Sequence, residues 1–260
     1  KEICKLFQDV RKNKSIKTVV FRVNSPGGSA LASDEIWREV KLTNKSKKVI
    51  VSMGDVAASG GYYVSTPASR IFAESSTITG SIGVFGIVPF IGDMLTDKLG
   101  LTFDRAMTNK HAVLSLNKKL TKEELSFLQE EVDKIYQDFL SRVAEGRGMS
   151  VAEVNRIARG RVWTGTDALK IGLVDEIGGI SDAIEYASKQ AGVDEAKVLY
   201  YPLQKEDPFA ELMEKIQEEE FAKTSNEESV SEELLAYYAR LKALDNMIGI
   251  QMRLPFYLNF

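Results

Sequence analysis

The stretch KTVVFRVNSPGGSALASDEIWREVKLTNKSKKVIVSM, residues 17–53, decides the fold. Two short runs rich in β-branched residues, 17–23 and 47–53, flank a segment, 29–45, whose apolar residues recur at helical spacing. Short apolar runs bounded by polar or glycine residues are typical of buried parallel strands, and the segment between them is typical of a crossover helix. The stretch therefore predicts a strand, a glycine turn, a helix and a second, parallel strand.

The same alternation continues after this stretch. A small-residue segment begins at Gly54, a helix is expected through residues 60–68, and a strand is expected at 70–75. Much later, residues 167–192 predict a helix, a turn, a short edge strand and another helix. Alternating strands and helices indicate an α/β fold built around a parallel sheet.

Two helix starts carry a hydroxyl residue followed three positions later by a glutamate. These are Thr121 with Glu124 and Ser150 with Glu153. This spacing is a capping box, in which each side chain satisfies a backbone N–H of the other residue. The first box predicts a long amphipathic helix, and the second predicts a short helix closed by Gly160.

Composition limits the class of protein. The 260 residues are 44% hydrophobic and 27% charged, which is the profile of a folded globular chain. The net charge is −3, so no basic surface points to nucleic acid as a partner. The single cysteine, Cys4, excludes an internal disulfide, and no spacing of His, Cys, Asp and Glu indicates a metal site.

Two parts of the chain differ in character. Residues 1–200 carry the β and α pattern, whereas residues 201–260 are acidic and predict a mainly helical C-terminal extension suited to packing or oligomer contacts. The chain begins at a lysine and shows no signal-peptide pattern, so we expect it to be part of a longer protein. The longest apolar candidate, 81–95, is shorter than the roughly 20 residues of a membrane-spanning helix.

Ser59 is the candidate nucleophile because small residues surround its hydroxyl directly after a strand. Such neighbours let a substrate backbone approach closely. A serine needs a base and oxyanion donors, and the backbone amide of Gly60 can supply one donor. Strand ends in a parallel sheet share one crevice, so Gly27 or Gly28 of the SPGG turn is expected to face Ser59. The hydroxyl should then lie at the mouth of a crevice, facing two sets of unpaired amides.

Four segments together resemble the signal peptide peptidase A family, also called protease IV, within the Clp-peptidase and crotonase-like superfamily. They are RVNSPGGSALASDEI (22–36), AASGGYYVSTPA (57–68), STITGSIGV (76–84) and VWTGTDALKIGLVDEIGG (162–179). The resemblance extends over residues 17–191, in the family's order. It implies a fold of repeated β-β-α units and no cofactor.

The resemblance also implies site roles. Ser59 matches the family's nucleophile, while Gly60, Gly27 and Gly28 match its oxyanion donors. Ser81 matches the hydroxyl that orients the base.

The family's base is a lysine that must be neutral, as burial in a low-dielectric site favours. An ungapped alignment places His111 at that position. The lysine can come from a preceding tandem domain, as in long family members, in which case this chain is a C-terminal half. Alternatively, Lys110 serves after a shift of one residue, or His111 itself acts as the base, as in related Clp peptidases.

By resemblance, the function is that of a serine endopeptidase that cleaves remnant signal peptides and other membrane-associated peptides through a Ser/Lys dyad. The expected setting is the bacterial cell envelope, anchored in the inner membrane by a region outside this chain, with the catalytic domain on the periplasmic face. The expected assembly is a bowl-shaped, tetramer-like homo-oligomer. Two other readings stay open: a crotonase-like acyl-CoA enzyme, which would not need Ser59, and a catalytically silent assembly domain.

Overall fold

The computed structural model describes residues 1–104, 106–109, 115–193, 197–202 and 249–253. The chain divides into two compact units, one formed by Lys1–Ala196 with Ile248–Phe260 and the other by Lys197–Met247. Most of the predicted 201–260 extension lies outside the described residues, so the predicted boundary near residue 200 stays a prediction.

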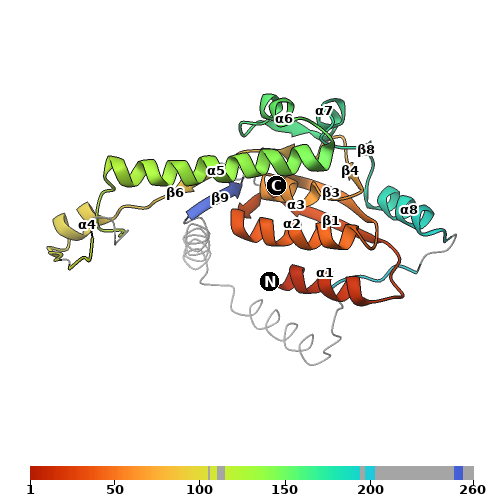
Figure 1. Cartoon of the computed structure of the whole chain (residues 1–260), viewed down its shortest axis with the longest axis horizontal. Helices are drawn as coiled ribbons and strands as arrows, with labels where there is room; N and C mark the ends of the chain where they lie inside the picture. The colour runs from red at the N-terminus through yellow and green to blue at the C-terminus, as the bar shows by residue number, and fades with distance from the viewer. Residues whose placement is uncertain (105, 110–114, 194–196, 203–248, 254–260) are drawn as a thin grey trace, which may run out of the picture. The chain divides into compact units, whose positions relative to one another are not determined.

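The described helices and strands follow one another in the order drawn in Figure 1. The helices are α1 (Glu2–Lys12), α2 (Ala30–Asn44), α3 (Gly60–Ser65), α4 (Gly92–Asp97), α5 (Lys122–Arg147), α6 (Val151–Ile157), α7 (Gly165–Lys170) and α8 (Ile180–Ala191). The strands are β1 (Val19–Ser25), β2 (Gly27–Ser29), β3 (Val49–Ala58), β4 (Arg70–Ala73), β5 (Ile78–Gly80), β6 (Phe85–Ile87), β7 (Val162–Thr164), β8 (Glu176–Ile177) and β9 (Gly249–Arg253).

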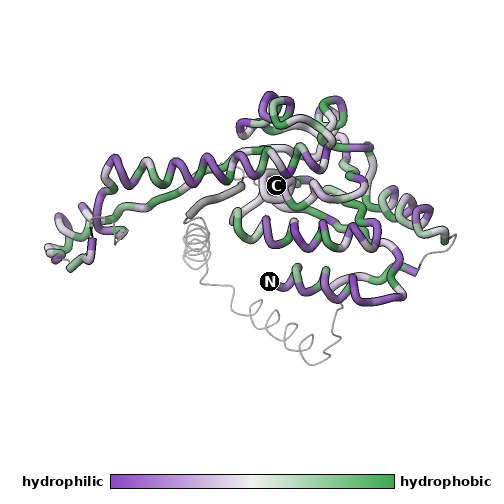
Figure 2. The backbone as a smooth tube through the Cα atoms, viewed as in Figure 1, coloured by the Kyte–Doolittle hydropathy of each residue, from purple (hydrophilic) through white to green (hydrophobic). Residues whose placement is uncertain are grey.

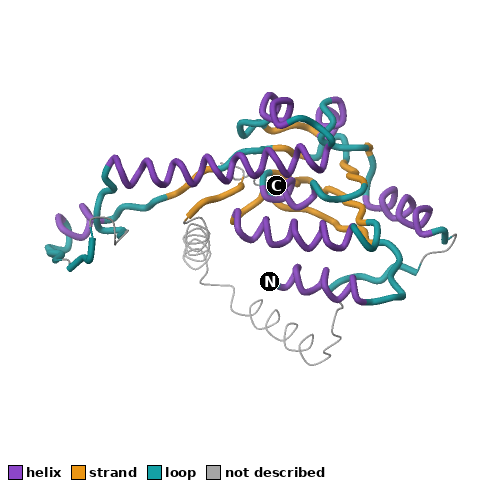
Figure 3. The backbone as a smooth tube through the Cα atoms, in the orientation of Figure 1, coloured by secondary structure: helices purple, strands orange, loops and turns teal. Residues whose placement is uncertain are grey.

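Strand β3 organises the larger sheet (Figure 3). It pairs in parallel with β1 along one edge, while β4 and then β5 pair in parallel along the other. The sheet ends in β8, which is parallel to β4, and in β7, which is antiparallel to β5. A second sheet has the order β2-β9-β6. The molecule is therefore a mixed α/β protein. The sequence predicts a parallel sheet, but the larger sheet contains one antiparallel pair, β5 with β7.

Both faces of β3 are covered. Val51 and Met53 lie in the large core cluster that also holds residues of α2, α3 and α5. Ile50, directly before Val51, points to the other face and packs with Ala183 and Ala187 of α8. This alternation is the period of two expected of a strand buried between helices. Figure 2 shows hydrophilic and hydrophobic residues alternating along the long α5, as expected for a helix with one face on the core.

Several sequence predictions are confirmed. The crossover helix is α2, and the long helix is α5, with the predicted capping box of Thr121 and Glu124. The second box, Ser150 with Glu153, opens α6. The predicted helix, turn, edge strand and helix near the end of the matched region are α7, β8 and α8.

Other elements were not predicted. Helix α1 precedes the first strand, and its buried Phe7 packs against α2 and β3 through Val40 and Val49. The short strands β2, β6 and β9 form a sheet of their own. In the part of the chain that the structure describes, we find no helix with the length and apolar character needed to cross a bilayer.

Candidate functional site

Ser59 occupies a strained turn between β3, which ends at Ala58, and α3, which begins at Gly60. Its φ is 52° and its ψ is −113°, a left-handed conformation that is uncommon for a residue other than glycine. Holding such a conformation costs on the order of 1–3 kcal/mol, so the surrounding structure must impose it. Strain of this kind clusters at functional sites.

Two backbone hydrogen bonds fix the turn. The N–H of Ser59 donates to the carbonyl of Gly80 at 2.8 Å, and the N–H of Tyr63 donates to the carbonyl of Ser59 at 2.8 Å. The strand before the turn is also held, because Thr79 Oγ1 donates to the carbonyl of Ala57 at 2.7 Å. Both the N–H and the carbonyl of Ser59 therefore form backbone hydrogen bonds.

The two tyrosines of α3 anchor the helix that follows Ser59. The hydroxyl of Tyr62 donates to the carbonyl of Leu173 at 2.8 Å, and burial raises its pKa. The hydroxyl of Tyr63 donates to Asp34 Oδ1 at 2.7 Å, and burial followed by that hydrogen bond raises its pKa as well. Both phenols stay neutral at ordinary pH and act here as structural hydrogen-bond donors.

The side chain of Ser59 has no such partner. Its exposed fraction is 0%, and Oγ is buried without a hydrogen-bond partner among the described residues. A buried hydroxyl left unsatisfied costs about 1–3 kcal/mol, so a purely structural role would be better filled by alanine. The sequence analysis predicts that this hydroxyl lies at the mouth of a crevice. In the structure the oxygen is buried, so the predicted exposure of the hydroxyl is wrong.

The SPGG turn lies at the same end of the sheet as Ser59. Ser25, the last residue of β1, is aligned with Ala57 of β3, so the turn that follows β1 runs beside the turn that follows β3. A side chain on Gly61 would place its Cβ 2.6 Å from the Ser25 carbonyl oxygen. Glycine at position 61 is therefore what lets the two turns approach each other.

The predicted amide donors differ in their surroundings. Gly60 is the first residue of α3, where a backbone N–H has no acceptor within the helix. Gly27 has a φ of 102°, and its N–H donates to Ser25 Oγ at 3.2 Å. This amide is therefore paired, whereas the sequence analysis predicts unpaired amides here. At Gly28, no atom lies within 4 Å of an added Cβ, which leaves open space beside this residue.

Ser81 follows β5, the strand aligned with β3 just before Ser59. It is buried, has a φ of 48°, and its N–H donates to the carbonyl of Arg161 at 2.7 Å. Two serines with left-handed backbones thus stand at the ends of adjacent parallel strands.

Asn24 is a positioning residue that the sequence reasoning missed. Its Oδ1 accepts from the N–H of Val56 at 3.1 Å, where the pairing of β1 with β3 is shifted. Gly54 permits this approach, because a Cβ there would lie 2.8 Å from the Asn24 side chain. The signal available in the sequence was an asparagine immediately before SPGG, since asparagine readily bonds to backbone groups at turns.

The predicted bases are not placed by the structure. Lys110 and His111 lie outside the described residues. Because Ser59 Oγ has no hydrogen-bond partner among the described residues, none of their lysine amines is within hydrogen-bond reach of it. The described residues also contain no cluster of His, Cys, Asp and Glu that could hold a metal ion.

The elements that flank Lys110 and His111 stand far from Ser59. Helix α5 packs on α3 through Phe139, whose ring centroid is 4.9 Å from that of Tyr63. The start of α5 at Lys122 lies 17 residues earlier, about 26 Å along the helix at 1.5 Å per residue. Asp93 of α4 forms an ion pair with Lys119, just before that start, and Figure 1 shows α4 at the end of α5 remote from α3.

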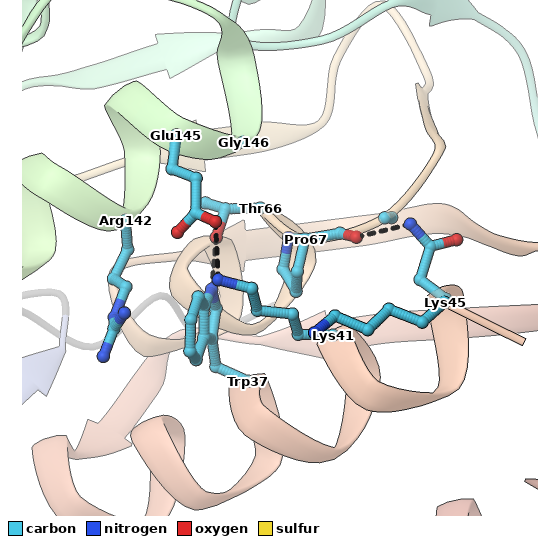
Figure 4. Close-up of a pocket in the computed structure, with 10 residues that line it drawn as sticks. Trp37, Lys41, Lys45, Thr66, Pro67, Arg142, Glu145 and Gly146 are labelled. Carbon is cyan, nitrogen blue, oxygen red and sulfur yellow. Dashed lines mark hydrogen bonds and ion pairs between the residues drawn. The ribbon is translucent and has the colours of Figure 1, made fainter.

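A separate pocket of about 310 Å³ lies between α2, the end of α3 and α5 (Figure 4). Arg142 stacks on the Trp37 ring at 3.8 Å, and Lys41 pairs with Glu145 at 2.5 Å. None of the predicted site residues lines this pocket.

Comparisons with known proteins show which family the chain resembles in sequence. The family described as Peptidase family S49 matches residues 41–194. The chain is 41% identical over 194 residues to a chloroplastic serine protease SPPA of Arabidopsis thaliana, covering 74% of this chain and 28% of the relative. It is 40% identical over 195 residues to Protease 4 of Salmonella typhi, covering 75% and 31%.

A shorter relative matches as well. The chain is 38% identical over 199 residues to a putative protease of Synechocystis sp., covering 76% of this chain and 71% of the relative. With respect to the two longer relatives, by contrast, the matched part of the chain spans less than a third of their length.

Proposed function

Because the chain belongs to peptidase family S49, we propose that Ser59 is the nucleophile of a serine endopeptidase. The observation that carries the proposal is the Ser59 hydroxyl, which is buried without a hydrogen-bond partner among the described residues and lies on a strained turn beside the SPGG turn. Stability alone gives no reason to keep both the strain and the unsatisfied oxygen. A nucleophile awaiting a base and a substrate accounts for both.

The reaction would proceed through an acyl-enzyme. The Ser59 oxygen attacks the carbonyl carbon of a peptide bond while a base takes the hydroxyl proton and passes it to the leaving amine. The amide of Gly60 and an amide of the SPGG turn would bind the negative oxygen of the tetrahedral intermediate. Gly28 is the better candidate within the turn, because the N–H of Gly27 donates to Ser25 Oγ. Water then hydrolyses the ester and restores the serine.

The base is proposed to be a lysine supplied by a preceding tandem domain, with Ser81 helping to orient it. Two observations support this. Ser59 Oγ has no hydrogen-bond partner among the described residues, and the matched part of the chain covers only 28% of the long chloroplastic relative. In the full-length protein, we expect Lys110→Ala and His111→Ala to keep peptide hydrolysis within about threefold of wild type. A loss of a hundredfold in either variant would place the base in this chain.

The finer assignments follow the same resemblance. We propose repeated β-β-α units of the Clp-peptidase and crotonase-like kind, remnant signal peptides and other membrane-associated peptides as substrates, and a bowl-shaped homo-oligomer. The proposed location is the outer face of a bacterial inner membrane, with the anchor outside this chain.

Labelling with a fluorophosphonate tests the proposal. The full-length protein should gain one adduct, on the peptide that contains Ser59, and Ser59→Ala should remove it. Ser126→Ala, at an exposed position of α5, is the matched control and should label normally. An unlabelled Ser59 in the full-length protein would favour a crotonase-like acyl-CoA enzyme or a silent assembly domain.

A further inference from the structure

Three of the described residues other than glycine have a positive φ. They are Ser59, Ser81 and Arg159, with φ values of 52°, 48° and 61°. A positive φ strains any residue that has a Cβ, and strain of this kind clusters at functional sites. The two serines belong to the candidate site, so the strain at Arg159 needs a reason of its own.

Arg159 occupies a tight turn that joins α6 to β7. The N–H of Arg161 donates to the carbonyl of Ala158 at 3.4 Å. The two residues between them, Arg159 and Gly160, both have a positive φ, as in a type I′ turn. Such a turn favours asparagine, aspartate or glycine at its first central position. Here that position carries a long cationic side chain instead, although asparagine would strain the turn less.

The turn lies at the end of the larger sheet that carries Ser59. Strand β7 is antiparallel to β5, so the residues just before β7 run beside those just after β5. The N–H of Ser81 donates to the carbonyl of Arg161 at 2.7 Å. The N–H of Gly160 donates to the carbonyl of Ile82 at 2.9 Å. Because β5 stands between β7 and β3, and neighbouring strands are about 4.8 Å apart, the backbone of the turn is about 10 Å from that of Ser59.

The turn is also strongly basic. Arg156, Arg159 and Arg161 fall within six residues, and all three are exposed. Arg161 Nη1 donates to the carbonyl of Arg156, which brings these two residues together. Among the described residues, none of the three guanidinium groups forms an ion pair. Like charges held close together repel one another, so stability gives no reason to gather them, whereas an anionic ligand accounts for both the charges and the strain.

The distance to Ser59 suits a ligand that is part of a peptide substrate. An extended peptide rises about 3.3 Å per residue, so one that crosses the strand ends from Ser59 reaches the turn after about three residues. A guanidinium binds a carboxylate through two parallel hydrogen bonds. Aspartate and glutamate are the peptide side chains that carry this group.

We infer that Arg159, with Arg156 and Arg161 beside it, determines specificity by binding an acidic side chain of the peptide substrate about three residues from the scissile bond. The inference rests on the proposed peptidase function and deepens it, because the acyl-enzyme reaction itself needs none of the three arginines.

Two substitutions at Arg159 separate its charge from the shape of the turn. Arg159→Asn removes the charge and suits a positive φ, so the stability measured by urea unfolding should stay the same or rise. Arg159→Lys keeps the charge on an equally strained backbone. Arg38→Gln removes an exposed charge from α2 and is the control for net charge.

The full-length protein is assayed with two pairs of fluorogenic peptides whose cleavage site is mapped by mass spectrometry. The members of a pair differ only in carrying aspartate or asparagine, three residues before the scissile bond in one pair and three residues after it in the other. In one pair, wild type should cleave the aspartate peptide with a kcat/KM roughly fivefold above that of the asparagine peptide, the upper range for one exposed ion pair. High salt should reduce this preference.

The variants give the decisive comparison. Arg159→Asn should lose the preference and cleave both peptides of the pair at the rate of the asparagine peptide. Arg159→Lys should keep a preference of about twofold or more, and Arg38→Gln should match wild type. Equal kcat/KM within both pairs for wild type, or a preference that survives Arg159→Asn, would overturn the inference. Weaker binding of Arg159→Asn to phosphatidylglycerol vesicles with an unchanged preference would overturn it too, because the turn would then bind anionic lipid.

Ser59→Ala separates this failure from failure of the proposed function. Cleavage that depends on Ser59 but shows no preference contradicts only the role of Arg159. If wild type cleaves none of the peptides, the peptidase function is contradicted, and fluorescence anisotropy of the same peptides still tests the turn. Tighter binding of an aspartate peptide to wild type than to Arg159→Asn would then support recognition of the carboxylate, and equal binding would overturn it.

Discussion

Ser59 and Ser150 each stand at the start of a short helix, yet the protein uses them in opposite ways. Ser150, before α6, has an ordinary extended conformation, and its hydroxyl accepts from the N–H of Glu153. Ser59, before α3, has a left-handed backbone, its side chain does not cap α3, and its Oγ is buried without a hydrogen-bond partner in the part of the chain that the structure describes. Ser150 follows the local rules of helix capping and contributes to stability. Ser59 breaks them, and departures of this kind are expected at functional sites.

The largest expected effect comes from Ser59→Ala. Peptide hydrolysis by the full-length protein should fall by roughly a thousandfold or more, since removal of a nucleophile leaves only binding and oxyanion stabilisation. The free energy of unfolding should stay the same or rise by about 1 kcal/mol, because an unsatisfied buried oxygen is removed. Initial rates and urea unfolding measure the two effects. A destabilised variant would mean that the hydroxyl has a structural partner.

The next effect concerns the approach of the SPGG turn to Ser59. Gly61→Ala would place a Cβ 2.6 Å from the Ser25 carbonyl, so the two turns must separate. We expect a loss of about 1–3 kcal/mol in stability and at least tenfold slower fluorophosphonate labelling of Ser59. Gly179→Ala is the control, since its added Cβ would meet its nearest neighbour at an ordinary 3.7 Å. Normal labelling in Gly61→Ala would mean that the SPGG turn is not needed.

A smaller effect is expected at Ser150, the second of the two serines compared above. Ser150→Ala should lower the free energy of unfolding by about 1 kcal/mol through loss of the helix cap. Hydrolysis and labelling should stay at the wild-type level, because Ser150 lies in the α6 cap. Urea unfolding and initial rates check the pair of expectations. A loss of activity without a loss of stability in Ser150→Ala would contradict the purely structural role given to Ser150.

The smallest effect is a dependence on pH at the same cap. Hydrogen bonds from the Ser150 side chain and then its backbone N–H lower the pKa of Glu153 below its ordinary 4.5. A carboxylate with a lowered folded pKa stabilises the fold above 4.5, and this stabilisation is lost as pH falls through the folded value. Ser150→Ala should therefore show a shallower loss of stability in acid below pH 4.5 than wild type. Urea unfolding at several pH values measures this, and parallel curves would contradict it.

Local signals in the sequence predicted much of this fold. Capping boxes gave α5 and α6, and β-branched runs around a glycine turn gave β1, α2 and β3. These elements are encoded by residues close in sequence, so periodicity and caps are sufficient. Small residues around Ser59 likewise identified the turn that the structure shows to be strained.

The missed features depend on distant partners. The pairing of Gly27 with Arg253 joins residues more than 200 positions apart, and three-residue strands have too little periodicity to be recognised alone. The burial of Ser59 could not be predicted for a related reason, because it depends on what tertiary structure places over the turn. Helix α1 was missed because it begins without a side-chain cap, although Phe7 and Val10 lie on one buried face.

A crystal structure of the full-length protein with a phosphonate bonded to Ser59 tests the central claim most directly. The account predicts that the phosphonyl oxygen lies within about 3.2 Å of the Gly60 nitrogen and of one nitrogen of the SPGG turn, the range of a good hydrogen bond. A phosphonyl oxygen turned away from both turns, or a phosphonate bonded elsewhere, would contradict it.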